Sequence, residues 1–105
     1  MGPKTEQLIG VLEQLAMLLE SDGDAHWSQW MRKARALLVN ADYRGIEYLL
    51  LAYGGMGSLN DLVLGQGSVD GVFAWKPGYV ELNEAFDLLR GQAATLANAI
   101  RRAQD

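Results

Sequence analysis

The chain has 105 residues, of which 50% are hydrophobic and 21% are charged, and this composition predicts one globular domain over residues 1–105. It has no cysteine and one histidine, which excludes disulfides, thiolate catalysis and metal centres built from cysteines or several histidines. Nine basic and thirteen acidic residues give a net charge of −4, which disfavours nucleic acid and favours a protein partner with a basic surface.

The first predicted element is a helix from Thr5 to Glu20, where apolar residues recur at helical spacing. Thr5 is expected to cap this helix, and residues 21–23 to end it. Polar residues interrupt the first apolar stretch, so it does not have the pattern of a signal peptide, and no apolar run approaches the ~18 residues of a membrane span. We therefore expect a cytoplasmic protein that does not bind membranes.

Two more helices are predicted in the first half. One runs from Ala25 to Val39 with Asp24 as its cap, and its buried stripe is expected to comprise Trp27, Trp30, Met31, Ala34, Leu37 and Leu38. Its basic residues are expected to point outward: Arg32, Lys33 and Arg35. The next helix is predicted from Tyr43 to Tyr53, capped by Asp42 and ended by two glycines.

Residues 54–78 hold seven of the twelve glycines and are expected to form a long ordered loop. Ser58 is placed to cap a short helical turn over residues 59–64, and residues 72–75 suit a short extended piece. A last helix is predicted from Val80 to Ala103, with Gly91 indicating a close helix contact or a kink. The expected fold class is all-α, a small antiparallel four-helix bundle with one Gly-rich loop between the third and fourth helices.

Known catalytic and cofactor motifs are missing from this sequence. The Gly-rich stretch 54–58 lacks the Gly-Lys-Ser/Thr ending of a phosphate-binding loop, and Gly65-Gln66-Gly67 lacks the third glycine of a dinucleotide fingerprint. His26 has no evident nucleophile to activate. Carboxylates along one helix row would leave a metal half-exposed. We therefore expect no cofactor, no metal and no enzymatic activity.

Three groups of residues are candidates for contacting a partner. Asn60 and Asp61 either bond to backbone N–H groups in a capped turn or project toward a partner. The carboxylates Glu81, Glu84 and Asp87 lie along one helix face, either solvated or forming a docking patch. Trp75 is a candidate anchor because it lies in the loop. The predicted partner-binding residues are Asn60, Asp61, Asp70, Trp75, Glu81, Glu84 and Asp87.

The segment 53–64, which reads YGGMGSLNDLVL, resembles the signature of a small uncharacterised family of bacterial helical domains. That signature is Gly-Gly-Met-Gly-Ser, then Leu or an aromatic residue, then Asn-Asp-Leu. Residues 45–47, Asn83 and residues 88–90 also resemble the family, so the likeness covers residues 40–100. The chain differs by a longer hydrophobic insertion around residues 71–79. The resemblance implies a helical fold but no particular activity.

In size, acidity and lack of catalytic groups, the chain is similar to bacterial immunity proteins, which bind and block a toxin delivered by neighbouring cells. We therefore predict an immunity protein that neutralises a cognate contact-dependent or type VI secreted toxin by covering its active surface. One alternative is a homo-oligomeric structural or regulatory protein, such as a homodimer. The other is a small enzyme using Asn60 and Asp61, which requires a nearby pocket and a carboxylate with a shifted pKa.

Overall fold

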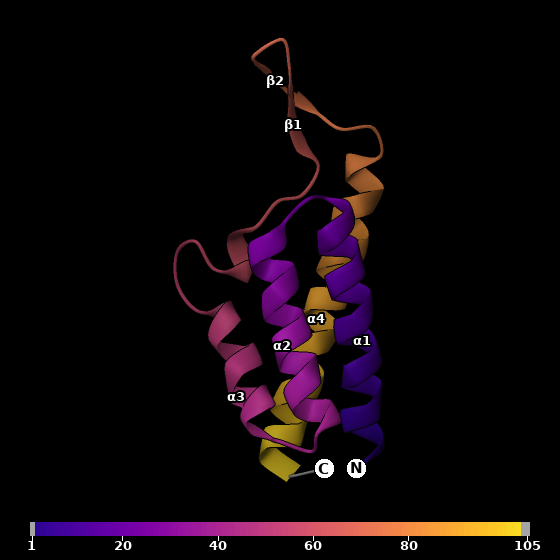
Figure 1. Cartoon of the computed structure of the whole chain (residues 1–105), viewed down its shortest axis with the longest axis vertical. Coiled ribbons are helices and arrows are strands. Elements are labelled where there is room, and N and C mark those ends of the chain that lie inside the picture. Colours follow the sequence, from indigo (N-terminus) through magenta and orange to yellow (C-terminus); the bar gives the residue numbers. More distant parts are fainter. Residues whose placement is uncertain (1, 104–105) are drawn as a thin grey trace.

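The computed structural model describes residues 2–103, which form four α-helices, two short 3₁₀ turns and one β-hairpin (Figure 1). The helices are α1 (Pro3–Ser21), α2 (Ala25–Val39), α3 (Arg44–Leu50) and α4 (Tyr79–Ala103). The 3₁₀ turns are η1 (Leu51–Tyr53) and η2 (Leu59–Asp61), and the strands are β1 (Gln66–Val69) and β2 (Val72–Trp75). The helical segments thus follow the predicted order.

The expectation of an all-α bundle is wrong, because the Gly-rich segment contains a two-stranded antiparallel sheet. Its central residues Asp70 and Gly71 suit a tight hairpin turn, and the β-branched and aromatic residues beside them favour strands. The fold is therefore mixed α and β. Figure 1 shows the hairpin projecting beyond the end of the helices, on the side away from both termini.

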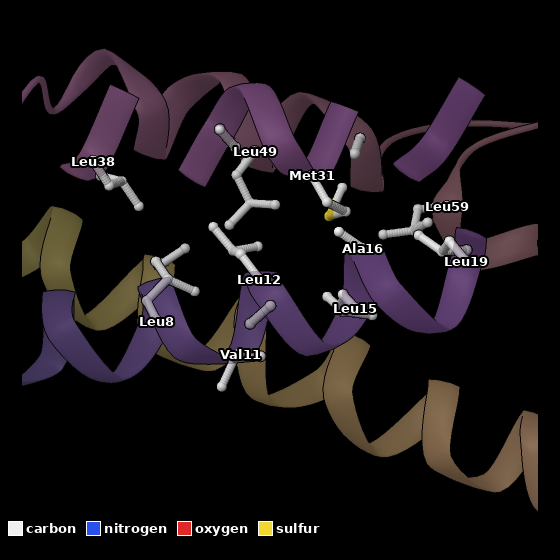
Figure 2. Close-up of a cluster of buried hydrophobic side chains, with 14 of the residues drawn as sticks. Leu8, Val11, Leu12, Leu15, Ala16, Leu19, Met31, Leu38, Leu49 and Leu59 are labelled. Carbon is white, nitrogen blue, oxygen red and sulfur yellow. The ribbon is translucent and has the colours of Figure 1, made fainter. Parts of the chain in front are cut away.

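The hydrophobic core lies between α1, α2, α3 and α4. α1 supplies its largest share, with Leu8, Leu12, Leu15 and Leu19 fully buried, and Phe86 and Ile100 contribute from α4. Figure 2 shows Leu12 of α1 pointing toward Leu49 of α3. Each fully buried leucine contributes roughly 1.5–3 kcal/mol to folding. The periodicity of α1 therefore predicts the main contacts of the bundle.

The starts of the helices agree only in part with prediction. Asp24 caps α2 as expected, since its Oδ1 accepts from the Trp27 N–H at 2.9 Å. Thr5 does not cap α1: the helix begins at Pro3 with Gly2 as its N-cap, and Thr5 is buried inside it. Proline is favoured at the first helical position because it has no N–H to satisfy there. Asp42 accepts from the Arg44 N–H at 3.0 Å, one residue before the cap position of α3.

α2 is joined to its neighbours by aromatic and ionic contacts. The Trp30 ring stacks on the Tyr48 ring of α3, with 4.7 Å between the ring centres. The Trp30 Nε1–H also donates to the Tyr48 carbonyl at 2.9 Å. On the other side, Arg32 donates to Glu20 at 2.8 Å and to Glu13 at 3.0 Å. These hydrogen bonds raise the pKa of Arg32. Part of the predicted basic surface is therefore neutralised by α1.

Gly91 makes no close helix contact, contrary to one of the two readings of the sequence. A Cβ added there would meet no atom within 4 Å, and the residue is exposed on α4. A close approach occurs instead at Gly45, where an added Cβ would lie 2.9 Å from the Ala34 carbonyl oxygen and 3.0 Å from the Leu37 Cβ. α3 therefore packs on α2 through Gly45.

These two glycines give a matched test of the packing. We expect Gly45→Ala to destabilise the protein by about 1–3 kcal/mol, because the new methyl group must displace backbone. Gly91→Ala should stabilise it by roughly 0.5–1 kcal/mol, since alanine is the better helix former. Urea unfolding followed by circular dichroism measures both. Equal stabilities of the two variants would contradict the close contact of α3 with α2.

Candidate functional site

The turn of the hairpin is two residues long, and both of its residues have a left-handed backbone. Asp70 has φ 53° and Gly71 has φ 80°, between the paired residues Val69 and Val72. Two positive φ values are the mark of a type I′ turn, whose twist matches that of the flanking strands. Glycine adopts this backbone freely, and aspartate tolerates it better than most residues. The turn therefore fixes the register of the strands.

Asp22, between α1 and α2, holds the base of the hairpin on the bundle. Its Oδ1 accepts from the Gly65 N–H at 3.0 Å and lies 3.2 Å from Lys76 Nζ. The Lys76 N–H donates to the Gly65 carbonyl at 2.7 Å and closes the base. The Asp22 side chain is only 12% exposed, so water and salt screen this ion pair less than a surface pair. The Asp22 carboxylate thus contacts the residue before β1 and the residue after β2, which lie together at the base of the hairpin.

Asn83 of α4 provides a second anchor. Its Oδ1 accepts from the Leu64 N–H at 2.8 Å, and its Nδ2 donates to the carbonyls of Leu64 at 2.9 Å and Tyr79 at 2.8 Å. Leu64 is fully buried, so without Asn83 its backbone polar groups would lose these partners. The glycine at position 65 allows this segment to lie close to the start of α4, since a Cβ there would be only 2.6 Å from the Cβ of Tyr79.

Three aromatic side chains form a row from the hairpin to the start of α4. We call Phe73, Trp75 and Tyr79 the aromatic row. The Phe73 and Trp75 rings meet edge to face at 5.0 Å, and Trp75 stacks on Tyr79 at 4.7 Å. Phe73 is 55% exposed and Trp75 is 44% exposed. Because residues two apart on a strand share a face, Phe73 and Trp75 present one exposed aromatic face.

The other face of the hairpin is also apolar. Val69 and Val72 pair directly across the strands, and both side chains are exposed. The hairpin stands beyond the helices, so its apolar side chains contribute little to the core (Figure 1). An exposed apolar surface on a rigid element is typical of a binding site.

The structure places most of the predicted acidic contact residues near this end of the molecule. Asp70 lies at the hairpin tip, and Glu81 and Glu84 are exposed in the first turns of α4. Asp87 is exposed one turn further on, and its Oδ1 accepts from Arg90 Nη2 at 2.7 Å. The hairpin and the start of α4 thus combine the predicted anchor Trp75 with carboxylates.

Asn60 and Asp61 lie elsewhere, in η2, and their side chains bond to backbone groups of the preceding residues 53–57. Asn60 Nδ2 donates to the Tyr53 carbonyl at 2.9 Å, and Asp61 Oδ2 accepts from the Gly57 N–H at 2.9 Å. Ser58 accepts from the Asn60 N–H at 3.3 Å, as its predicted capping role requires, although the turn ends at Asp61. These bonds follow the structural reading of the pair, and contact with a partner stays a prediction.

The same segment is tied to α4 through Tyr53 and Arg90. The Tyr53 hydroxyl donates to the Arg90 carbonyl at 2.8 Å, and burial raises the pKa of Tyr53. Arg90 Nη1 donates to the carbonyls of Leu59 at 3.2 Å and Asn60 at 3.1 Å. The loop so held presents Met56, which is 99% exposed.

Sequence reasoning missed several residues of this site. Phe73 and Tyr79 of the aromatic row were not singled out, nor were the anchors Asp22 and Asn83 as contacts of the hairpin. One local signal was available: an Asp-Gly pair flanked by valines is a strong hairpin pattern. The anchoring contacts join residues 43 and 19 positions apart, which local patterns do not reveal.

One pocket of the described residues lies far from the hairpin. A pocket of about 370 Å³ lies toward the opposite end of the bundle, lined by Tyr43, Ile46, Glu47, Ile100 and Arg101. Within residues 2–103, no three metal-ligating side chains come together. In that range no helix has the length and apolar content needed to cross a membrane.

Comparison with known proteins places the chain in an uncharacterised group. Residues 20–72 match a family model described as a domain of unknown function, DUF6966. Searches of the curated proteins and of the solved structures found no match. The matched segment runs from the end of α1 to the first residue of β2. It contains the hairpin turn and the loop of residues 54–58, which we call the Met56 loop.

The anchor on α4 can be tested with a pair of asparagine variants. We expect Asn83→Ala to destabilise the protein by about 1–3 kcal/mol, because the buried backbone of Leu64 loses two hydrogen bonds. Asn98→Ala is the control, since Asn98 Nδ2 donates to a carbonyl of its own helix. Urea unfolding measures the stability, and amide exchange of residues 64–76 reports the hairpin. An Asn83→Ala hairpin that exchanges like the wild type would contradict the anchoring role.

Proposed function

The chain belongs to the DUF6966 family of domains of unknown function, which assigns it no activity, and from its structure we propose that it is a binding protein rather than an enzyme. Its partner is a protein with a basic surface. Within that class, we propose a cytoplasmic bacterial immunity protein that neutralises a cognate toxin by covering the toxin's active surface.

The observation that carries this proposal is the anchored, apolar hairpin. A two-stranded hairpin alone is marginally stable in water, yet here Asp22 and Asn83 hold one that buries little of its own apolar surface. Trp75 lies in the middle of the aromatic row. Tryptophan and tyrosine are enriched among the residues that dominate binding energy at interfaces. The hairpin is therefore the surface best suited to receive a partner.

Charge supports a basic partner. The chain carries a net charge of −4, and Asp70, Glu81 and Glu84 are exposed around the hairpin end. Opposite potentials speed the encounter of two proteins and orient them. Catalysis has less support, because the Asp61 carboxylate is exposed and already accepts a hydrogen bond from the Gly57 N–H.

The first test removes the central aromatic anchor. We expect Trp75→Ala to weaken partner binding by at least about 30-fold, the loss typical of a dominant interface residue. Leu51→Ala is the matched control, since Leu51 is 71% exposed but follows α3, away from the hairpin. Tagged variants are used to capture proteins from the source cells, and the captured protein is then titrated in purified form.

The toxin assignment requires its own readout. The captured protein should stop growth when it is expressed alone, and co-expression of this chain should restore growth. Capture of an enzyme substrate, or of this chain alone, would reject the immunity role. Equal capture by Trp75→Ala and Leu51→Ala would reject the hairpin as the binding surface.

The acidic residues give a separate prediction. We expect Glu81→Lys with Glu84→Lys to slow association with the partner about tenfold and to weaken its dependence on salt. Asp87 is left unchanged because it bonds to Arg90, which holds the Met56 loop. Stopped-flow association rates at low and physiological salt measure the effect, with Glu6→Lys on α1 as the control. An unchanged rate and salt dependence would show that these carboxylates do not face the partner.

A further inference from the structure

The hairpin has free edges as well as exposed faces. In an antiparallel pair, opposite residues alternate between hydrogen-bonded pairs and pairs whose N–H and C=O groups point away from the partner strand. The Lys76 N–H donates to the Gly65 carbonyl, so the pair at the base is hydrogen-bonded. Because the pairs alternate, the register makes the pairs at Ala74 and at Val72 hydrogen-bonded as well. The backbone groups of Phe73 and Trp75 therefore point outward along the edge of β2.

This edge lacks the usual protection against pairing with another chain. Proteins commonly guard an exposed strand with charged side chains, proline, a bulge or a covering segment. β2 reads Val-Phe-Ala-Trp, with neither a charge nor a proline, and pairs with β1 residue for residue without a bulge. Lys76 and Pro77 come only after the strand. The short length of β2 is its main limit on pairing.

The edge of β2 suits an added strand better than the edge of β1. Cross-strand contacts between aromatic, β-branched and other large side chains stabilise sheets. A strand beside β2 would contact Phe73 and Trp75 on one face and Val72 on the other. A strand beside β1 would lie next to Gln66, Gly67 and Ser68, so Val69 near the tip would be its one large apolar contact on that strand.

We propose that the edge of β2 binds an extended segment of the basic protein partner, which adds a third strand to the hairpin. This inference rests on the proposed function, because it specifies how that partner is held. A second copy of this chain is the less favourable occupant, since each copy carries a net charge of −4 and brings its own Asp70. Lysine or arginine in the segment would instead meet Asp70 at the tip.

The test uses a displayed library of random twelve-residue peptides, selected on the wild-type protein. Selected peptides are synthesised and titrated against Phe73→Ala, which keeps the outward N–H, and Phe73→Pro, which removes it. Ser68→Pro blocks the other edge and serves as the control. We expect Phe73→Pro to bind at least about tenfold more weakly than Phe73→Ala, and Ser68→Pro to bind like the wild type.

Amide exchange of the wild-type protein gives a readout that needs no variant to fold. Peptide binding should slow exchange at Phe73 and Trp75, whose N–H groups point outward, while Val72 and Ala74 are already protected by the hairpin. The selected peptides should alternate apolar and basic residues. Sedimentation of the free protein identifies pairing with a second copy.

The outcomes separate this inference from the proposed function. If selection yields no peptide that protects Phe73 and Trp75, or if Phe73→Pro binds as well as Phe73→Ala, edge pairing is wrong. A captured toxin that still depends on Trp75 would then bind through the aromatic face, and the proposed function would stand. Protection of these amides by peptides, together with capture of a harmless protein, would reject the toxin but keep the edge site. A dimer formed through this edge would overturn the choice of occupant.

Discussion

The hydrogen bonds that Asp22 and Asn83 make to the backbone of Leu64 and Gly65 determine where the hairpin stands. These two side chains come from opposite halves of the sequence, one from the turn after α1 and one from α4. Between them they satisfy backbone groups that a chain leaving the core must otherwise bury without partners. The position of the hairpin therefore depends on the packing of the helices that position these two side chains.

This dependence explains how an apolar hairpin can remain exposed. Isolated hairpins are marginal because their few hydrogen bonds hardly offset the loss of chain entropy. Here the base is fixed by the bundle and the tip by the type I′ turn at Asp70 and Gly71, so less ordering remains when a partner binds. Preorganisation of this kind raises affinity without adding contacts. The rings of the aromatic row are thus held in place without being part of the hydrophobic core.

The helices could be predicted from the sequence because their apolar residues repeat within a few positions. Leu8, Leu12 and Leu15 are buried as that repeat requires, and Asp24 caps α2. The hairpin could not be predicted in the same way, since its strands have four residues each and β2 does not alternate apolar with polar. The extended piece expected over residues 72–75 is β2, whereas its pairing with residues 66–69, indicated locally by the Asp-Gly turn, was not predicted. Thr5 failed as a cap because Pro3 begins the helix earlier.

The predicted contact residues divide along similar lines. Trp75 and Asp70 are predicted to contact a partner because a tryptophan or a carboxylate in a glycine-rich segment is conspicuous, and the structure places both on the hairpin. Asn60 and Asp61 are equally conspicuous, but their side chains bond to the backbone of residues that come just before them in the chain. Two neighbouring polar side chains can bond to nearby backbone groups as well as to a partner. Which backbone groups lie within reach depends on the course of the chain around them.

The limits of the family match clarify how the proposed surface is assembled. Residues 20–72 include Asp22, Gly65 and the hairpin turn, whereas Trp75 and Asn83 lie beyond them. The matched segment thus supplies β1, the tip and one anchor, and the remainder supplies the aromatic strand and the second anchor. Neither part forms the surface alone, because Lys76 must reach back to Asp22 to close the base. The proposed binding surface at β2 is therefore formed by the packed chain and not by the matched segment alone.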